Sequence, residues 1–259
     1  MNQELVYKPK TISMKKLVLH IPHASVYFPN KIGYVVSEER LQEELTKMTD
    51  WYTDELFANP NDLACIVPFS RLFCDVERFK SDELEPMSQF GMGFAYTHCE
   101  NGQLLRQLTP AEREEIEHFY DAHHDQLNQV VGQELKKNGS VLIVDCHSFP
   151  NLPSQCNFNQ RVPRPDFNIG TDPDHTSEAL SQFCVRFFEE KGFTVGLDWP
   201  YSGTMVPNDF WHQDQRAQSV MLEINRRLYL EPGTNQKSNQ FEAIKDLTQS
   251  FLKALRDQF

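Results

Sequence analysis

Short apolar segments along the chain predict buried β-strands. They are rich in Val, Ile and Leu and do not alternate cleanly between apolar and polar residues, which is typical of strands covered on both faces by helices. The expected strands are Lys16–Ile21, Leu63–Pro68, Val141–Asp145, Phe193–Leu197 and Ser219–Ile224. A sheet buried between helical layers is therefore expected.

Apolar residues at helical spacing predict helices between these strands. The predicted helices start at Ser37, at Thr109-Pro110-Ala111-Glu112, at Ala179 and at Phe241. The second start is a capping box with Pro at the first helical position, and Gly139 supplies its stop. Because strand and helix alternate, we expect an α/β fold: a single three-layer domain over residues 1–259, around a mixed, mostly parallel sheet.

Three long stretches show no regular periodicity: 79–109, 149–174 and 199–218. Loops longer than about 15 residues inside a compact domain are usually functional. We therefore expect these three segments to form the walls of a site.

Composition excludes several classes of protein. The chain has 37 acidic and 25 basic residues and a formal net charge of −12, which argues against nucleic-acid binding. It has no apolar run of the ~20 residues that a membrane span needs, and the polar segment before Leu17 has no secretory-signal core. Six cysteines without a C-x-x-C pair indicate reduced, buried thiols of a cytoplasmic protein.

Ionisable side chains lie at the ends of several of the predicted strands. His23 comes after the first strand, Arg71 after the second and His147 after the third, while Glu223 lies in the fifth. Ligands of open α/β sheets bind outside the carboxyl ends of the strands. We therefore expect these side chains to meet in a site.

His23 and His147 are candidate metal ligands, since hydrolytic zinc sites take three protein ligands from His, Asp and Glu. The third ligand is expected to be a carboxylate, with Asp50 and Asp54 as the candidates. Asp145 lies two residues before His147, so on a strand it shares that side chain's face and could orient the imidazole. The alternatives are hydrogen-bonded loop histidines and an aspartate that caps a turn.

Glu223 lies in the apolar run Val220–Ile224. A carboxylate there is costly unless it is paired or used. It could act as a general base that takes a proton from water. The alternative is a buried ion pair with Arg71, Arg226 or Arg227.

Arg71 and Arg78 could bind an anionic group of a substrate, because guanidinium engages carboxylate in a bidentate manner. Asp75 or Glu77 could instead pair with them in a purely structural cluster.

The other histidines give weaker signals. His123 and His124 are adjacent in a predicted helix, so we expect at most one to face inward. The remaining ones, expected at the surface or in loops, are His98, His118, His175 and His212.

Together these residues resemble the N-formylglutamate amidohydrolases, metal-dependent amidases related in fold to the zinc carboxypeptidases. The resemblance runs from about His20 to Tyr229. It rests on Pro22-His23-Ala24, Thr49-Asp50-Trp51, Ser70-Arg71, Asp75-Val76-Glu77-Arg78, His124, Asp145-Cys146-His147-Ser148, Asp166–Thr171, Gly203 and Leu222-Glu223.

The resemblance implies one divalent metal, zinc above all, held by His23, Asp50 and His147. It makes Glu223 the base and Arg71 the electrophilic helper. The residues it implies for substrate binding are Arg78, Gly203 and Asn225, and those it implies around the metal ligands are Asp145, Asp75 and His124. It places Thr49–Trp51 in a helix.

The implied activity is hydrolysis of the amide bond of a small N-acyl amino acid, with N-formyl-L-glutamate as the family's substrate. One position departs from the family pattern: Asp-Leu-Asn-Arg is common where this chain has Asp75-Val76-Glu77-Arg78. The Glu77 carboxylate adds a negative charge beside the expected carboxylate anchor Arg78. Two alternatives follow: a binding protein that holds a carboxylate ligand without turnover, and a carboxypeptidase-like metallopeptidase.

Overall fold

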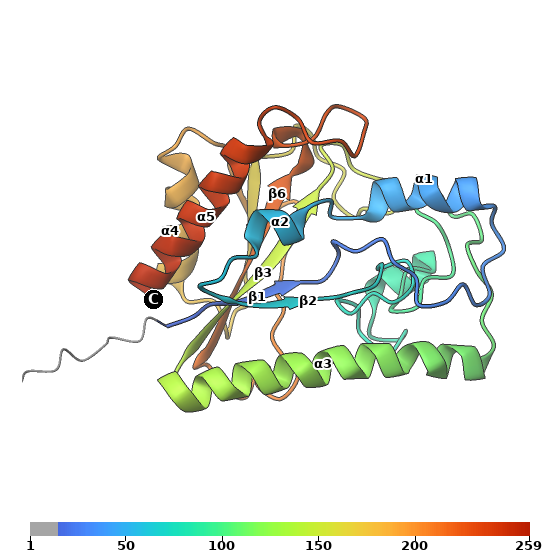
Figure 1. Cartoon of the computed structure of the whole chain (residues 1–259), viewed down its shortest axis with the longest axis horizontal. Helices are drawn as coiled ribbons and strands as arrows, with labels where there is room; N and C mark the ends of the chain where they lie inside the picture. The colour runs from blue at the N-terminus through green and yellow to red at the C-terminus, as the bar shows by residue number, and fades with distance from the viewer. Residues whose placement is uncertain (1–14) are drawn as a thin grey trace, which may run out of the picture.

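The computed structural model describes residues 15–259, and its strands form one sheet in the order β2-β1-β3-β6-β4-β5 (Figure 1). The strands are β1 (Val18–Ile21), β2 (Leu63–Ile66), β3 (Val141–Phe149), β4 (Phe167–Gly170), β5 (Val195–Leu197) and β6 (Ala217–Asn225). Neighbouring strands are parallel except for β4 and β6, which are antiparallel. The expected α/β fold with a mixed, mostly parallel sheet is confirmed.

Helices cover both faces of the sheet. They are α1 (Glu38–Met48), α2 (Thr53–Phe57), α3 (Pro110–Asn138), α4 (Glu178–Glu189) and α5 (Phe241–Gln258), with 3-10 turns η1 (Pro86–Phe90) and η2 (Arg226–Leu228). The long helix α3 runs along one face, and α2, α4 and α5 lie on the other (Figure 1). The predicted caps are present: Ser37 begins α1, and Thr109 and Glu112 form the capping box of α3.

Alternation along β3 decides which face of the sheet carries the polar residues. Its even-numbered apolar residues pack into the core shared with α2, α4 and α5, whereas Val141 and Ile143 pack with α3. Asp145 and His147 continue this second row, because successive strand residues point to opposite faces. In the parallel register, Glu223 of β6 lies opposite His147. The polar residues thus collect on the α3 face, near the carboxyl ends of the strands.

Each of the five predicted strands exists, but its limits differ from the prediction by one or more residues, and two of the differences bear on the site. β3 continues to Phe149 and β6 to Asn225, so His147 lies within a strand and not in the loop after it. β4 lies inside the stretch expected to be irregular at 149–174. It has only two core residues, of which Phe167 stacks on Phe188 of α4 at a ring distance of 4.0 Å. Two apolar residues in four are too weak a periodicity to detect.

The expectation of strands covered on both faces fails at the sheet edges. Residues of β2 and β5 are partly exposed, because each strand has only one neighbour and incomplete helical cover. The short helix α2 and the turn η1 carried too few residues for a periodic signal.

The prediction that at most one of His123 and His124 faces inward was also wrong. His123 and His124 are both buried, because α3 packs between the sheet and the turn at residues 75–78. His175 is buried as well, and its ring nitrogens bond to the backbone of Ala217 and His212.

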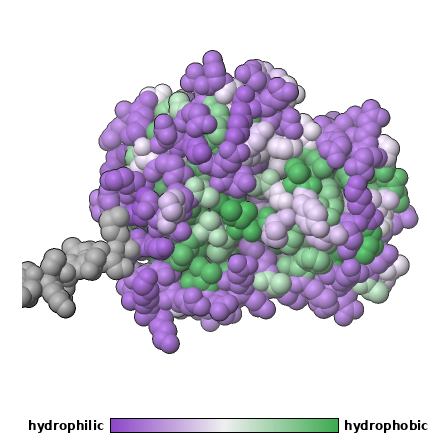
Figure 2. All heavy atoms as spheres, viewed as in Figure 1, coloured by the Kyte–Doolittle hydropathy of each residue, from purple (hydrophilic) through white to green (hydrophobic). Residues whose placement is uncertain are grey.

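Figure 2 shows a mostly hydrophilic face with apolar side chains gathered in patches above α3. Within residues 15–259, no helix is long and apolar enough to cross a membrane. The six cysteines are free and buried. Most of the polar segment before Leu17 lies outside the described residues.

Candidate functional site

His23 and His147 present the same ring nitrogen to one point of the site. His23 follows β1, and its Nε2 lies 2.9 Å from Oδ1 of Asp75. His147 Nε2 lies 3.0 Å from Oδ1 of Asp145. A carboxylate beside Nε2 holds the proton on that nitrogen and leaves Nδ1 with a free lone pair. His23 Nδ1 is buried and has no hydrogen-bond partner among the described residues.

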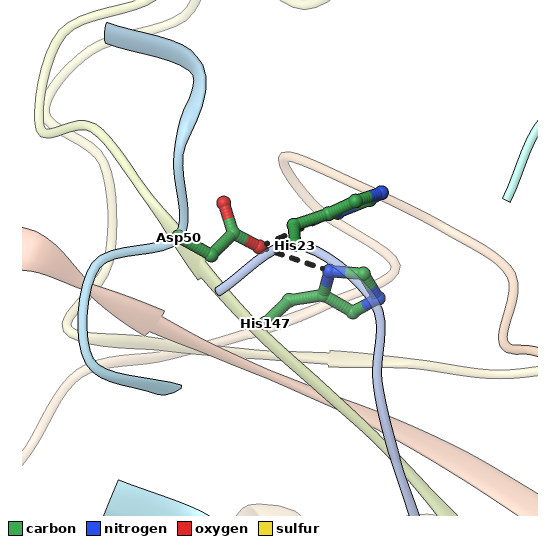
Figure 3. Close-up of side chains that lie close together, drawn as sticks. All are labelled: His23, Asp50 and His147. Carbon is green, nitrogen blue, oxygen red and sulfur yellow. Dashed lines mark hydrogen bonds and ion pairs between the residues drawn. The ribbon is translucent and has the colours of Figure 1, made fainter. Parts of the chain in front are cut away.

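Asp50 completes this group (Figure 3). Its Oδ2 lies 3.1 Å from His147 Nδ1 and 3.6 Å from His23 Nδ1. Its Oδ1 accepts a hydrogen bond of 2.8 Å from Arg226 Nη2. Asp50 lies in the link between α1 and α2, not in a helix as expected, and its backbone N–H donates to the His23 carbonyl at 3.0 Å. That bond fixes the link to the end of β1.

The three residues fit a divalent cation. One donor atom from each lies within 4.8 Å of the others, and all three side chains are buried. Although burial opposes ionisation, hydrogen bonds with His147 and His23 hold the pKa of Asp50 well below its usual range. Two imidazoles and a carboxylate match the ligands of hydrolytic zinc sites, and the unpartnered His23 Nδ1 is the atom that a cation would satisfy. Asp54, the other candidate, is in α2 and does not join this group.

Glu223 lies beside these donors with a carboxyl group that the protein leaves unpaired. Its Oε2 is buried without a hydrogen-bond partner among residues 15–259, and none of their cationic side chains lies within 4.0 Å. Burial raises the pKa of Glu223 to about 8, with the charge of Asp50 acting in the same direction and His147 against it. A carboxyl group with a pKa near neutrality can both accept and return a proton.

Asp75 joins both arginines to the site. Its Oδ2 accepts hydrogen bonds from Arg71 Nη2 at 2.8 Å and from the Tyr96 hydroxyl at 2.7 Å, and lies 3.5 Å from Arg78 Nε. Although burial opposes ionisation, the charges of Arg71 and Arg78 and the hydrogen bond with His23 keep the pKa of Asp75 well below its usual range. The Asp75 carboxylate therefore positions Arg71, Arg78 and His23 together.

Glu77 points away from the arginines and towards two histidines. Its Oε1 lies 3.1 Å from His20 Nδ1 and its Oε2 lies 3.3 Å from His147 Nε2. His20 Nδ1 is also 2.9 Å from Asp145 Oδ1, and its Nε2 is 2.9 Å from His123 Nε2. Although burial opposes the charged form, the bonds with Asp145 and Glu77 raise the pKa of His20 to about 9. The negative charge of Glu77, which lies next to Arg78 in the sequence, is thus balanced by the imidazole of His20.

These side chains open into a cavity of about 910 Å³. His23, Asp50, His147, Glu223, Arg71 and Arg78 all line it. Residues from each of the three long stretches also line it: Met87, Met92 and Glu100 from the first, 149–157 from the second, and Tyr201 and Ser202 from the third. The turn at 230–234 adds a wall that the sequence did not indicate.

Five residues implied by the resemblance do not line this cavity: Asp75 and Asp145, described above, and Asn225, Gly203 and His124. The Asn225 side chain donates to the Pro165 carbonyl at 2.8 Å and caps η2. Gly203 has φ +90° and lies against Gly170. His124 Nε2 lies 2.9 Å from the Val76 carbonyl and supports the turn that carries Glu77 and Arg78. We leave Asn225 and Gly203 out of the proposed substrate contacts.

Sequence reasoning missed two residues of the site. The sequence indicates Arg226 as a partner of Glu223, but its guanidinium bonds to Asp50 and to the Ser148 carbonyl. The sequence indicates no role for His20, although its imidazole contacts the carboxylates of Glu77 and Asp145. The available signals were the basic pair directly after the strand of Glu223 and the spacing His20-Ile21-Pro22-His23.

A family model described as N-formylglutamate amidohydrolase matches residues 15–230. The chain belongs to this family. The N-formylglutamate amidohydrolase from Ralstonia eutropha JMP134 has a similar structure, with 26% identity, a TM-score of 0.76 and coverage of 94% of this chain and 95% of that one. The gene product Atu2144 from Agrobacterium tumefaciens shares the fold, at 20% identity, a TM-score of 0.60 and coverage of 93% and 91%. No curated protein matches the chain.

Proposed function

We propose that this amidohydrolase-family protein is a metal-dependent enzyme that hydrolyses the amide bond of a small N-acyl amino acid. The observation that carries the proposal is the convergence of His23 Nδ1, Asp50 Oδ2 and His147 Nδ1 beside the unpaired carboxyl group of Glu223. The family and the Ralstonia relative are named for N-formylglutamate, which is therefore the reference substrate.

A divalent cation, with zinc as the expected ion, would be held by His23, Asp50 and His147. When bound there, it would lower the pKa of a water molecule and polarise the acyl oxygen. Asp75 and Asp145 keep the protons of the two imidazoles on Nε2, and Arg226 fixes Asp50 through its other oxygen. The protein thus orients all three ligands before the cation binds.

Glu223 moves the proton in this proposal. It accepts a proton from the attacking water and returns it to the nitrogen of the leaving amine. Arg71 stabilises the negative oxygen of the tetrahedral intermediate, because its Nη1 is not used by Asp75, which bonds to Nε and Nη2. Arg78 binds the carboxylate of the amino acid.

Replacing Glu223 tests the proton transfer. We expect Glu223→Gln to lower kcat/KM for N-formyl-L-glutamate by about 10²- to 10⁴-fold, the usual contribution of a general base. The metal content should not change, since Glu223 is not among the three ligands. Steady-state assays with elemental analysis of the same samples measure both. A variant with normal turnover would show that another group moves the proton.

Replacing a metal ligand tests the metal itself. We expect the wild type to hold about one divalent ion per chain, and His23→Ala and His147→Ala to lose it together with activity. The matched control is His175→Ala, which removes a buried histidine that bonds only to backbone. A metal-free wild-type protein that binds carboxylates without turnover would support the binding-protein alternative instead.

A further inference from the structure

The cavity is larger than N-formylglutamate requires. Its volume of about 910 Å³ lies near the upper end of the ~300–1,000 Å³ that hold drug-sized ligands. N-formylglutamate has about a dozen non-hydrogen atoms, fewer than the ligands that such cavities enclose. A substrate that fills this cavity has a larger group next to the reacting amide.

Most cationic groups that line the cavity are already bound to the protein. Arg226 uses its guanidinium on Asp50, on Ser148 and on the Lys47 carbonyl. Lys47 pairs with Glu100 at 2.5 Å, and Arg227 pairs with Asp166 at 2.7 Å. Because these groups have partners, they are poor anchors for a second carboxylate of a substrate.

Arg78 differs from the other lining cations. Its Nε is buried, lies 3.5 Å from the nearest Asp75 oxygen and has no hydrogen-bond partner among residues 15–259. The Arg78 side chain as a whole is 24% exposed and lines the cavity, so the outer nitrogens of its guanidinium can bind a carboxylate there. The cavity thus offers one ready carboxylate anchor, which suits an amino-acid carboxylate.

Part of the cavity wall is apolar, and one of its residues, Met87, is connected through Glu85 to the residue that follows Arg78. The Glu85 carboxylate connects these two segments of the chain. Its Oε2 accepts a hydrogen bond from the Phe79 N–H at 2.9 Å, and its Oε1 accepts one from the Met87 N–H at 2.8 Å. Apolar side chains continue along the lining: Met48, Met87, Met92, Leu152, Cys156 and Leu230. The acidic side chain of Glu231 also lines the cavity and disfavours a further negative charge.

We propose that the preferred substrate is the N-formyl derivative of an amino acid with a large apolar side chain, and not N-formylglutamate. The carboxylate binds Arg78, and the side chain on the neighbouring carbon packs on the apolar wall of Met48, Met87, Met92 and Leu152. This inference rests on the proposed amide hydrolysis and names the amino acid class that the same site accepts.

A substrate series tests the inference on the metal-loaded wild-type protein. We expect kcat/KM for N-formyl-L-phenylalanine and N-formyl-L-tryptophan, whose side chains are larger than that of glutamate, to exceed that for N-formyl-L-glutamate by at least about tenfold, since each lost apolar contact costs about 10- to 200-fold. Equal or better hydrolysis of the glutamate derivative would overturn the inference and leave amide hydrolysis intact. No hydrolysis of any N-formyl amino acid would overturn both.

A positive charge introduced on the apolar wall tests the same inference, because it should shift the preference back towards N-formylglutamate. Leu152→Arg would supply the second carboxylate anchor, so we expect the preference for phenylalanine over glutamate to fall at least about tenfold, mainly through KM. The matched control is Leu84→Arg: Leu84 is 67% exposed against 68% for Leu152, and it does not line the cavity. The control should keep the wild-type preference. An unchanged preference in Leu152→Arg would contradict the placement of the side chain on this wall.

Discussion

Glu223 shows how the protein tolerates a costly residue for the sake of its site. Its carboxyl group is buried, unpaired and held at a raised pKa of about 8. A side chain of the same shape without a charge would suit this position better for stability. The structure therefore predicts a conflict between stability and activity at this one residue.

This conflict appears as a pH dependence of stability in the metal-free protein. The pKa of Glu223 is about 8 in the folded state and 4.5 as a model value. The folded state therefore binds a proton that the unfolded state releases, and this residue's contribution weakens as pH rises from about 4.5 to 8. We expect Glu223→Gln to be more stable than the wild type at pH 8 by on the order of 2–4 kcal/mol, and little changed at pH 4.5.

Urea denaturation at both pH values measures this difference. Glu223→Asp is a useful comparison because it retains the carboxyl group and should retain the pH dependence. A constant difference between Gln variant and wild type from pH 4.5 to 8 would show that the Glu223 proton does not contribute.

The sequence could predict that certain ionisable residues meet in one site, because the carboxyl ends of parallel strands lie at the same edge of a sheet. That argument selected His23, His147 and Glu223, and the structure brings them to one cavity. It could not find the partners of Glu77, because the turn at 75–78 directs this carboxylate to His20 and His147, and such a direction depends on packing against α3.

At the scale of elements, the sequence predicted those features that depend on contacts between residues close together in the chain. The capping box of α3 is a contact between residues three apart, so the sequence alone contains it. β4 depends on pairing with β6 and β5, which are distant in sequence, and only two of its four residues are large and apolar. The same holds for the link between α1 and α2, whose bond to His23 places Asp50.

Removing the capping box tests the start of α3. Thr109→Ala deletes the oxygen that accepts from the Glu112 N–H at 3.3 Å, and should lower the free energy of unfolding by about 1 kcal/mol. Thr109→Ser keeps the oxygen and should stay close to the wild type. Because Thr109 does not line the cavity, kcat/KM should be unchanged in both variants. Equal destabilisation by Ala and Ser would mean that the hydroxyl does not cap the helix.

At the scale of the whole molecule, the candidate metal ligands connect segments far apart in the chain. His23 follows β1, Asp50 lies in the link after α1, and His147 lies in β3. A cation bound by all three would hold these segments together only in the folded state. Metal binding and global stability should therefore be coupled.

Chelation measures this coupling. A ligand present at 1,000 times its Kd stabilises the folded state by about 4 kcal/mol, which for a domain of this size corresponds to a Tm shift of roughly 8–16 °C. We expect a chelator to lower the Tm of the wild type by about that amount and added Zn²⁺ to restore it. His23→Ala should show no response to either treatment, because it lacks the imidazole whose Nδ1 is left unpaired for the cation. His175→Ala also loses a buried histidine but retains all three ligands, so its Tm should respond as the wild type does. If the wild type and His23→Ala responded equally to chelator and zinc, the cation would bind elsewhere, and the assignment of His23, Asp50 and His147 would be wrong.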